Sequence, residues 1–274
     1  MTQTERGEAF RRLHERPGAF VIPNPWDAGT ARLLAALGFE ALATTSGGYA
    51  GSLGRRDGQL TRDEALRGAA AIVEATPLPV SADLEHGFAD DPGTVAETIR
   101  LAAAVGLVGA SIEDSTGRLD DPIYPLPLAV ERVAAAVEAA RSLPFPFVLT
   151  ARAENHLQGL DDLDDTIRRL RAYEAAGADV LYAPGLRRME QVRAVCAAVS
   201  RPVNVIAAPG FTVEGLAEAG VSRVSLGSAL WRAAIAAVSS AAREVRQEGS
   251  LRFLEGLPSF GEASTLVAGP PGAP

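Results

Sequence analysis

Short apolar runs alternate along the chain with longer stretches in which apolar residues recur at helical spacing. The runs predict eight strands: Phe20–Ile22, Ala41–Thr44, Val80–Ala82, Gly109–Ile112, Phe147–Ala151, Val180–Ala183, Val203–Ile206 and Val224–Leu226. Between the strands, spacings such as that of Val130, Val133 and Val137 predict amphipathic helices. Eight strands, each followed by a helix, predict an α/β fold of the (β/α)₈ TIM-barrel type, with an open doubly wound sheet as the alternative.

Local signals define where several helices begin and end. Pro92 follows Asp91 and predicts a helix start with an aspartate cap. Glycines just before the next strand predict helix ends at Gly38, Gly106, Gly177 and Gly220. No repeat or internal linker interrupts the pattern, so we predict a single barrel domain over residues 1–262 and a disordered tail over 263–274, which ends in Gly-Pro-Pro-Gly-Ala-Pro.

Composition narrows the class of protein. The 274 residues are 47% apolar, which suits one α/β barrel with a large core. A net charge of −8 with no basic stripe argues against a nucleic-acid partner, and no apolar run is long enough for a membrane span. The N-terminus lacks the apolar core of a signal peptide, and the single cysteine, Cys196, fits helix packing rather than a disulfide. We expect a cytoplasmic protein.

One residue type is missing: the sequence contains no lysine. Schiff-base aldolases and pyridoxal phosphate enzymes both need a lysine amine, and so does a phosphate-binding P-loop. These three kinds of chemistry are therefore excluded.

Carboxylates gather at the ends of neighbouring predicted strands, where a barrel carries its functional groups. Asp83 and Glu85 follow the third strand and point to the same side by the two-residue period. Glu113 follows the fourth strand, and Arg152 and Glu154 follow the fifth. Adjacent carboxylates repel unless a cation or proton relieves them, so the pattern predicts a divalent metal with oxygen ligands.

Other residues near predicted strand ends suit an anionic ligand. Arg152 could grip a carboxylate or phosphoryl group with two donors, or it could form a salt bridge to Glu113 or Glu154. The turn Ser46-Gly47-Gly48 could bring backbone N–H groups close to an anion, or it could be an ordinary glycine turn. Trp26 could line the pocket or close the barrel rim.

At these residues the sequence resembles the isocitrate lyase/phosphoenolpyruvate mutase superfamily. The resemblance covers roughly Pro23 to Leu230. It rests on Asn24-Pro25-Trp26-Asp27-Ala28, Thr44-Thr45-Ser46-Gly47, Asp57-Gly58, Asp83-Leu84-Glu85-x-Gly87, Ile112-Glu113-Asp114 and Ala151-Arg152-Ala153-Glu154. It implies a Mg²⁺ (or Mn²⁺) site and small 2-oxo or 2-hydroxy carboxylate substrates, or their phosphonate analogues, reacting through an enolate.

The resemblance also assigns roles to residues. It implies that Asp83, Glu85 and Glu113 hold the metal and its waters, with Asp57 reaching in from a loop. From it and the strand-end pattern we predict catalytic roles for Asp57, Tyr49 and Arg152. We predict substrate contacts from six residues: Trp26, Ser46, Gly47, Gly48, Arg152 and Asn204.

The segment after the fourth strand departs from the superfamily pattern. Isocitrate and methylisocitrate lyases carry a cysteine-containing catalytic loop there, and the mutases and phosphonopyruvate hydrolases carry a lysine and an asparagine. Residues Ser115–Pro122 contain none of these. We expect Ser115–Pro125 to be a mobile lid without a proton donor of the cysteine type. The acid/base candidates that remain are His86, Tyr49, Tyr124 and His156.

The leading hypothesis is a Mg²⁺-dependent carbon–carbon lyase acting on a small 2-oxo or 2-hydroxy carboxylate, by retro-aldol cleavage or decarboxylation. Decarboxylation demands least of the missing acid, because water can protonate the enolate. The alternatives are phosphorus–carbon bond chemistry and a catalytically silent carboxylate-binding protein. The resemblance further implies exchange of the last helix in a homodimer or homotetramer, and the alanine-rich Ser228–Val245 suits burial against a partner.

Overall fold

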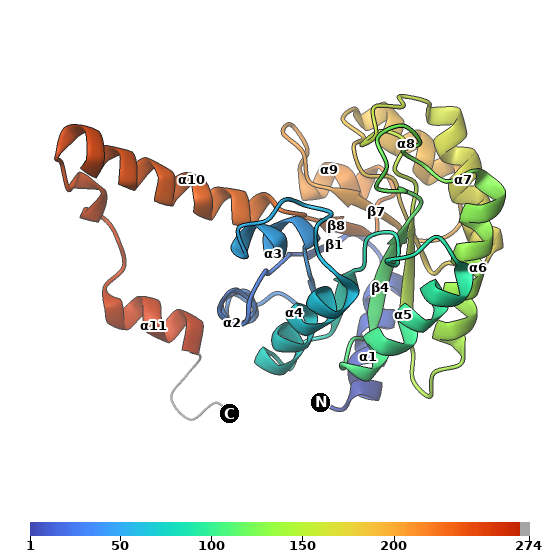
Figure 1. The fold of residues 1–274 in the computed structure, drawn as a ribbon, viewed down its shortest axis with the longest axis horizontal. Coiled ribbons are helices and arrows are strands. Elements are labelled where there is room, and N and C mark those ends of the chain that lie inside the picture. The colour runs from blue at the N-terminus through green and yellow to red at the C-terminus, as the bar shows by residue number, and fades with distance from the viewer. Residues whose placement is uncertain (269–274) are drawn as a thin grey trace.

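The computed structural model describes residues 1–268, which form a parallel eight-stranded barrel with helices around it (Figure 1). The strands are β1 (Phe20–Ile22), β2 (Leu42–Ala43), β3 (Val80–Asp83), β4 (Gly109–Glu113), β5 (Val148–Arg152), β6 (Val180–Tyr182), β7 (Val203–Ile206) and β8 (Arg223–Ser225). Neighbours pair in the order β1-β8-β7-β6-β5-β4-β3-β2. Between β1 and β2, the Ala43 N–H donates to the Pro23 carbonyl at 3.0 Å. The predicted (β/α)₈ barrel is confirmed, and no strand end differs from its predicted position by more than one residue.

Most helices follow a strand and cover the outside of the barrel, while the first and the last two lie elsewhere. They are α1 (Gln3–Glu15), α2 (Ala28–Ala36), α3 (Ser46–Ser52), α4 (Arg62–Ala75), α5 (Pro92–Ala104), α6 (Leu126–Arg141), α7 (Leu163–Ala175), α8 (Met189–Ala198), α9 (Val213–Glu218), α10 (Ala229–Arg243) and α11 (Phe260–Ala268). The predicted cap of α5 is confirmed, because the Asp91 carboxylate accepts a hydrogen bond from the Thr94 N–H at 2.8 Å. Gly106 and Gly177 end α5 and α7 with φ of 93° and 99°, a backbone region that favours glycine.

Helix α1 closes the barrel at the N-terminal ends of the strands. Phe10 and Leu13 of this helix are buried in a cluster with Phe20, Val148 and other residues from the strand starts. The opposite end of the barrel therefore provides the access to its interior, as is general for this fold.

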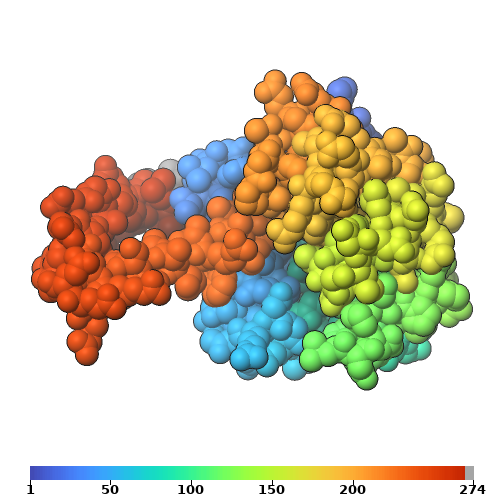
Figure 2. Space-filling model, turned by 90° about the horizontal axis from the view of Figure 1, so that it is seen from above, coloured from blue at the N-terminus to red at the C-terminus, as the bar shows by residue number. Residues whose placement is uncertain are grey.

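The C-terminal segment leaves the barrel as an arm (Figures 1 and 2). No residue of α10 is buried, and Val238 on this helix is 66% exposed. A π-helical turn (Glu244–Glu248) and a 3₁₀ turn (Arg252–Leu254) follow, and α11 lies beside α2. Helix α11 corrects the expectation of a disordered tail for residues 263–268, whereas 269–274 lie outside the described residues. Within the described chain, no helix combines the length and apolar character that crossing a membrane requires.

Candidate active site

A cavity of about 670 Å³ opens at the C-terminal ends of the strands and continues into the barrel. We call Asp57, Asp83, Glu85, Glu113 and Arg152 the cavity rim. We call Asn204, Arg223 and Ser225, which lie deeper, the cavity floor. All eight of these residues line the same cavity, whose volume suits a small-molecule ligand.

The cavity exists because polar side chains alternate with apolar ones along the strands. On β4, Ala110 and Ile112 pack outward into the core beneath the helices, while Ser111 and Glu113 line the cavity. On β8, Val224 packs outward while Arg223 and Ser225 line the cavity. Barrel interiors of this kind are usually filled by branched aliphatic side chains. Small polar residues here leave space that a ligand can enter.

Arg152 is the centre of the rim, because its guanidinium group contacts carboxylates from three neighbouring segments. It lies 2.9 Å from Asp83, 3.1 Å from Glu113 and 2.9 Å from Glu154. Burial alone would lower its pKa, but the charges of Glu154, Glu113 and Asp83 raise the pKa well above its ordinary value. The salt bridges that were the alternative interpretation of this arginine are present, and its role as a substrate grip stays a prediction.

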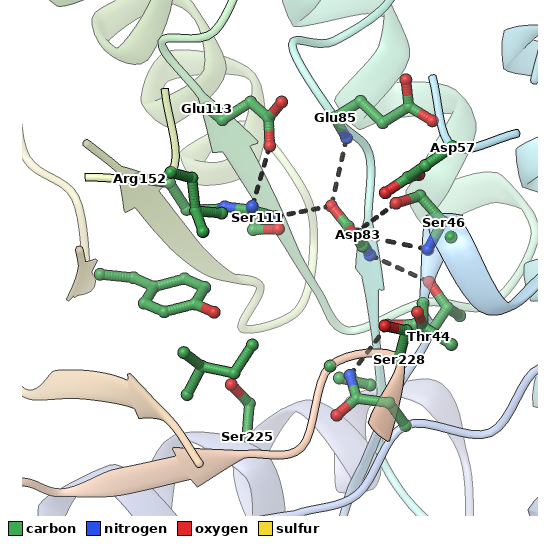
Figure 3. A pocket seen from close by; sticks show the side chains of 18 of the residues that line it. Thr44, Ser46, Asp57, Asp83, Glu85, Ser111, Glu113, Arg152, Ser225 and Ser228 are labelled. Carbon is green, nitrogen blue, oxygen red and sulfur yellow. Dashed lines mark hydrogen bonds and ion pairs between the residues drawn. The ribbon is translucent and has the colours of Figure 1, made fainter. Parts of the chain in front are cut away.

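Asp83 connects the arginine with the start of α3 (Figure 3). One carboxylate oxygen accepts from Arg152 at 2.9 Å and from the Glu85 N–H at 3.3 Å. The other accepts from the Ser46 hydroxyl at 2.9 Å and from the Ser46 N–H at 3.4 Å. The structure thus brings Ser46 and Arg152, predicted from distant parts of the sequence, onto one carboxylate.

Glu85 sits in a strained and poorly satisfied position. Its φ of 49° is unusual for a residue other than glycine, and its buried Oε1 has no hydrogen-bond partner among the described residues. Burial, together with the charges of Asp83 and Asp57, raises the pKa of Glu85 to about 8. A buried acceptor without a donor indicates a group that takes a further partner.

Glu113 and the neighbouring Glu154 are also held in conditions that disfavour their charge. Burial raises the pKa of Glu113 well above its ordinary value, and Arg152 opposes that rise. Burial likewise raises the pKa of Glu154, again against Arg152. One arginine faces several acids here, so the rim has a surplus of negative charge that a cation would relieve.

The rim offers the hard oxygen donors that Mg²⁺ prefers. Within residues 1–268, however, no three side chains of His, Cys, Asp or Glu are arranged to hold a metal ion directly. Mg²⁺ commonly takes one or two carboxylates and keeps several waters. With the unpaired Glu85 oxygen, the donor set fits such a partly hydrated ion rather than a closed protein cage.

Three predicted site residues do not line the cavity, and their assignment stays a prediction. Tyr49 packs against α4, where its ring fills the space that a side chain on Gly68 would need. Gly48 lies against Thr45 and Trp231, so its lack of a side chain serves helix packing. Trp26 lies beyond the end of β1 and is half-buried outside the cavity. Ser46, Gly47, Asp57, Asp83, Glu85, Glu113, Arg152 and Asn204 do line it.

Sequence reasoning missed several cavity residues, because it examined only the strand ends. Buried Asn24 takes the inward position two residues before Trp26; it donates to the Thr44 carbonyl at 3.0 Å and accepts from the Leu226 N–H at 2.9 Å. Ser111 and Arg223 also line the cavity. The signal was the two-residue period, which could have been followed back from each strand end toward its start.

Of the four acid/base candidates, only His86 lines the cavity. Burial, assisted by the charge of Arg132, lowers the pKa of His86 below its ordinary value. Tyr124 is buried outside the cavity lining and donates to Asp90 at 2.5 Å, and burial raises its pKa to about 12. His156 lies 3.0 Å from Asp161, away from the cavity.

The segment Ser115–Pro125 forms a hairpin-like flap over one side of the rim. Thr116 N–H donates to the Pro122 carbonyl at 3.0 Å, and Ser115 bridges to Ile123. Arg118 ties the flap to Asp90 at 3.2 Å. Ser115 and Gly117 line the cavity, while Leu119 is fully exposed. The expected mobility of this lid stays a prediction.

Comparison with known proteins relates this geometry to enzymes. A family model described as phosphoenolpyruvate phosphomutase matches residues 10–246. The 2-methylisocitrate lyase of Escherichia coli is 30% identical over 89% of this chain and 86% of its own. The oxaloacetate decarboxylase of Ectopseudomonas mendocina is 30% identical over 88% of this chain and 85% of its own.

Two solved structures are also similar to this chain. A Burkholderia cenocepacia protein, assigned only provisionally as a lyase or mutase, is 58% identical over 98% of this chain and 97% of its own, with a TM-score of 0.95. A complex of phosphonopyruvate hydrolase with oxalate and Mg²⁺ is 25% identical, with a TM-score of 0.85 over 97% of this chain and 95% of its own. The fold of this chain is thus shared by related chains of known structure.

Proposed function

The chain belongs to the isocitrate lyase/phosphoenolpyruvate mutase superfamily and is an enzyme of its lyase and mutase group, and on that premise we propose a specific activity. We propose that it is a Mg²⁺-dependent carbon–carbon lyase that cleaves a small 2-oxo or 2-hydroxy carboxylate to give a pyruvate-type enolate. The observation that carries this proposal is the rim, where acids from two successive strands surround one arginine above a cavity of small-molecule size.

Asp83, Glu85 and Glu113 would hold Mg²⁺, directly or through water, and Asp57 would reach the same ion from its loop. When bound, Mg²⁺ would polarise the substrate's carbonyl and stabilise negative charge that develops on its oxygen. The complex of phosphonopyruvate hydrolase with oxalate and Mg²⁺ supports this, because oxalate has the shape of a 2-oxo acid's reacting end.

The chain's own residues would orient the substrate. Arg152 balances the charge of Asp83 and Glu113, and it would place a planar pair of donors beside the substrate's carboxylate. The Ser46 hydroxyl and N–H donate to the other oxygen of Asp83, and they would contribute further donors beside the substrate. Donors fixed in this way stabilise developing oxyanion charge without reorganising during the reaction.

The flap argues against two of the superfamily's activities, the cleavage of isocitrate and of 2-methylisocitrate. Residues Ser115–Pro125 contain no cysteine, lysine, histidine or asparagine. A placed general acid contributes roughly 10²–10⁴ in rate, so 2-methylisocitrate cleavage should be slow or absent. His86 is the titratable cavity residue best suited to exchange a proton, because its lowered pKa keeps it neutral near pH 7.

A substrate panel tests the proposal. The purified protein is incubated with Mg²⁺, or with a chelator as the control, and with 2-oxo and 2-hydroxy acids including oxaloacetate, 2-methylisocitrate and phosphonopyruvate. We expect Mg²⁺-dependent release of pyruvate from a 2-oxo or 2-hydroxy carboxylate. Turnover of phosphonopyruvate alone would replace the proposal with phosphorus–carbon chemistry. Oxalate binding without turnover of any compound would favour a silent carboxylate-binding protein.

We also propose that the arm formed by α10 and α11 binds a second copy of the chain. Ile235 and Val238 are 48% and 66% exposed, and Phe260 is 88% exposed, on a segment that extends away from the barrel (Figure 2). Exposed apolar surface of this extent indicates a protein partner. Light scattering should give a dimer or larger assembly, and a chain truncated after residue 228 should lose it; a full-length monomer at micromolar concentration would contradict this.

A further inference from the structure

We propose that the cavity floor is a second anionic subsite, in which Arg223 binds a carboxylate at the far end of the substrate. The orientation of the substrate rests on the proposed function, because the rim is taken to hold the reacting 2-oxo or 2-hydroxy end. The subsite itself rests on how Arg223 is buried and on what surrounds it.

Arg223 is 5% exposed, and the groups that contact it are neutral. Its guanidinium group donates to Asn204 Oδ1 at 2.8 Å and to Thr150 Oγ1 at 2.9 Å, and one nitrogen lies 3.2 Å from His14 Nε2. Across residues 1–268, no carboxylate forms an ion pair with it. A buried charge without a counterion is expensive, so this arrangement is suited to an anion supplied from outside the chain.

His14 makes the site neutral rather than acidic. Its Nδ1 lies 2.8 Å from the Phe10 carbonyl, so Nδ1 carries the proton and Nε2 accepts from Arg223. Burial, with the charge of Arg223, lowers the pKa of His14 to about 3. Burial lowers the pKa of Arg223 only to about 10, so the arginine stays charged at neutral pH beside an uncharged histidine.

Arg223 also has N–H groups that are free to bind a ligand. A guanidinium group has five N–H bonds, and the three partners above use one on each nitrogen. The remaining N–H on each terminal nitrogen has no partner in the described residues, and Arg223 lines the cavity. Arg132 is a useful contrast: it is equally buried, but it donates to three backbone carbonyls and does not line the cavity.

The separation between floor and rim suits a short dicarboxylate. Thr150, which accepts from Arg223, and Arg152 lie two residues apart on the same face of β5. Two residues of a strand span about 6.5 Å, so the guanidinium group of Arg223 lies roughly one layer of side chains below that of Arg152. The cavity joins the two, with Ser225 and Tyr182 along its wall.

The subsite has a chemical consequence. A carboxylate leaves as carbon dioxide only by losing its charge, and an arginine that holds it opposes that loss. The carboxylate at Arg223 should therefore be retained in a product. In a retro-aldol cleavage the hydroxyl proton leaves as the carbon–carbon bond breaks, the bonding electron pair passes into the enolate, and the enolate carbon regains a proton. The second fragment then departs as a carbonyl compound that keeps its carboxylate.

Calorimetry with matched ligands tests the subsite. In the presence of Mg²⁺, 2-oxoglutarate is compared with 2-oxopentanoate, which has a methyl group in place of the distal carboxylate, and oxalate reports on the rim alone. The wild-type protein should prefer 2-oxoglutarate at least tenfold. Arg223→Met should weaken 2-oxoglutarate binding about 100-fold and leave oxalate binding within threefold. Arg223→Lys, which keeps the charge, should retain part of the preference.

Three outcomes overturn the subsite. These are equal binding of the two 2-oxo acids by the wild-type protein, an unchanged preference in Arg223→Met, and an equal loss in the control Arg141→Gln, which changes a surface arginine outside the cavity. The ligand comparison on the wild-type protein decides the matter even if Arg223→Met does not fold. Failure of oxalate to bind with Mg²⁺ would instead remove the proposed function, while a distal-carboxylate preference would still support the subsite.

Discussion

The rim and the floor of one cavity balance their charges in opposite ways. At the rim, Arg152 faces Asp83, Glu113 and Glu154, so negative charge is in excess. At the floor, Arg223 faces neutral partners, so positive charge is in excess. The first arrangement is suited to a cation and the second to an anion. A ligand with a distal carboxylate, bound together with a metal ion at its other end, would balance the excess charge at both the floor and the rim.

The largest effect should come from breaking the rim at its central acid. Asp83→Ala removes the acceptor of Arg152, Ser46 and the Glu85 N–H together. We expect Mg²⁺ binding to fall below detection and turnover to fall by about 10³-fold or more. Calorimetric titration with Mg²⁺ measures the first, and Asp164→Ala, an exposed acid on α7, is the control. Unchanged Mg²⁺ affinity would remove Asp83 from the metal site.

A milder change tests the planar arginine at the rim. Arg152→Lys keeps one positive charge, but an ammonium group cannot hold Asp83, Glu113 and Glu154 in the same three-way geometry. We expect kcat/KM to fall about 100-fold. Arg141→Lys alters a surface ion pair with Asp179 and should have little effect. Wild-type efficiency in Arg152→Lys would show that the rim needs only charge.

Burial of neutral His14 beside Arg223 should make the free energy of unfolding depend on pH. The pKa of His14 is about 3 in the folded chain and near 6.5 when unfolded, so the unfolded chain binds more protons between these values. Stability contributed by neutral His14 is complete above pH 6.5 and is lost as the pH falls toward 3. Relative to His14→Gln, the wild-type free energy of unfolding should drop by about 2 kcal/mol from pH 6.5 to 4.5. Denaturant unfolding of both proteins at the two pH values measures this, and parallel behaviour would contradict a buried neutral histidine.

The smallest effect should come from a residue outside both ends of the cavity. Cys196 lies on α8 next to Gly220, and burial raises the pKa of its thiol to about 11. The thiol is therefore protonated at neutral pH. Cys196 also does not line the cavity. Cys196→Ala should leave kcat and KM within twofold of wild type in steady-state assays. A large loss of kcat would mean that this cysteine takes the place of the one missing from the flap.

The sequence by itself determined the barrel and the composition of the rim. The short apolar runs placed all eight strands to within one residue, because strands in the centre of a barrel are buried beneath the helices and need apolar side chains there. Acids at the ends of parallel strands then had to meet at one end of the barrel, which is why Asp83, Glu85 and Glu113 were found together.

Tertiary structure alone decided which charges are balanced. The sequence offered salt bridges for Arg152, which binds three carboxylates, but it gave no sign that Arg223 is buried with none among the described residues. It also could not show that Tyr49 turns toward α4 and away from the cavity. Periodicity gives the face on which a side chain lies, but the sign of its surroundings depends on strands and helices far away in sequence. His14 is 209 residues from Arg223 and reaches it only because α1 folds beneath the barrel.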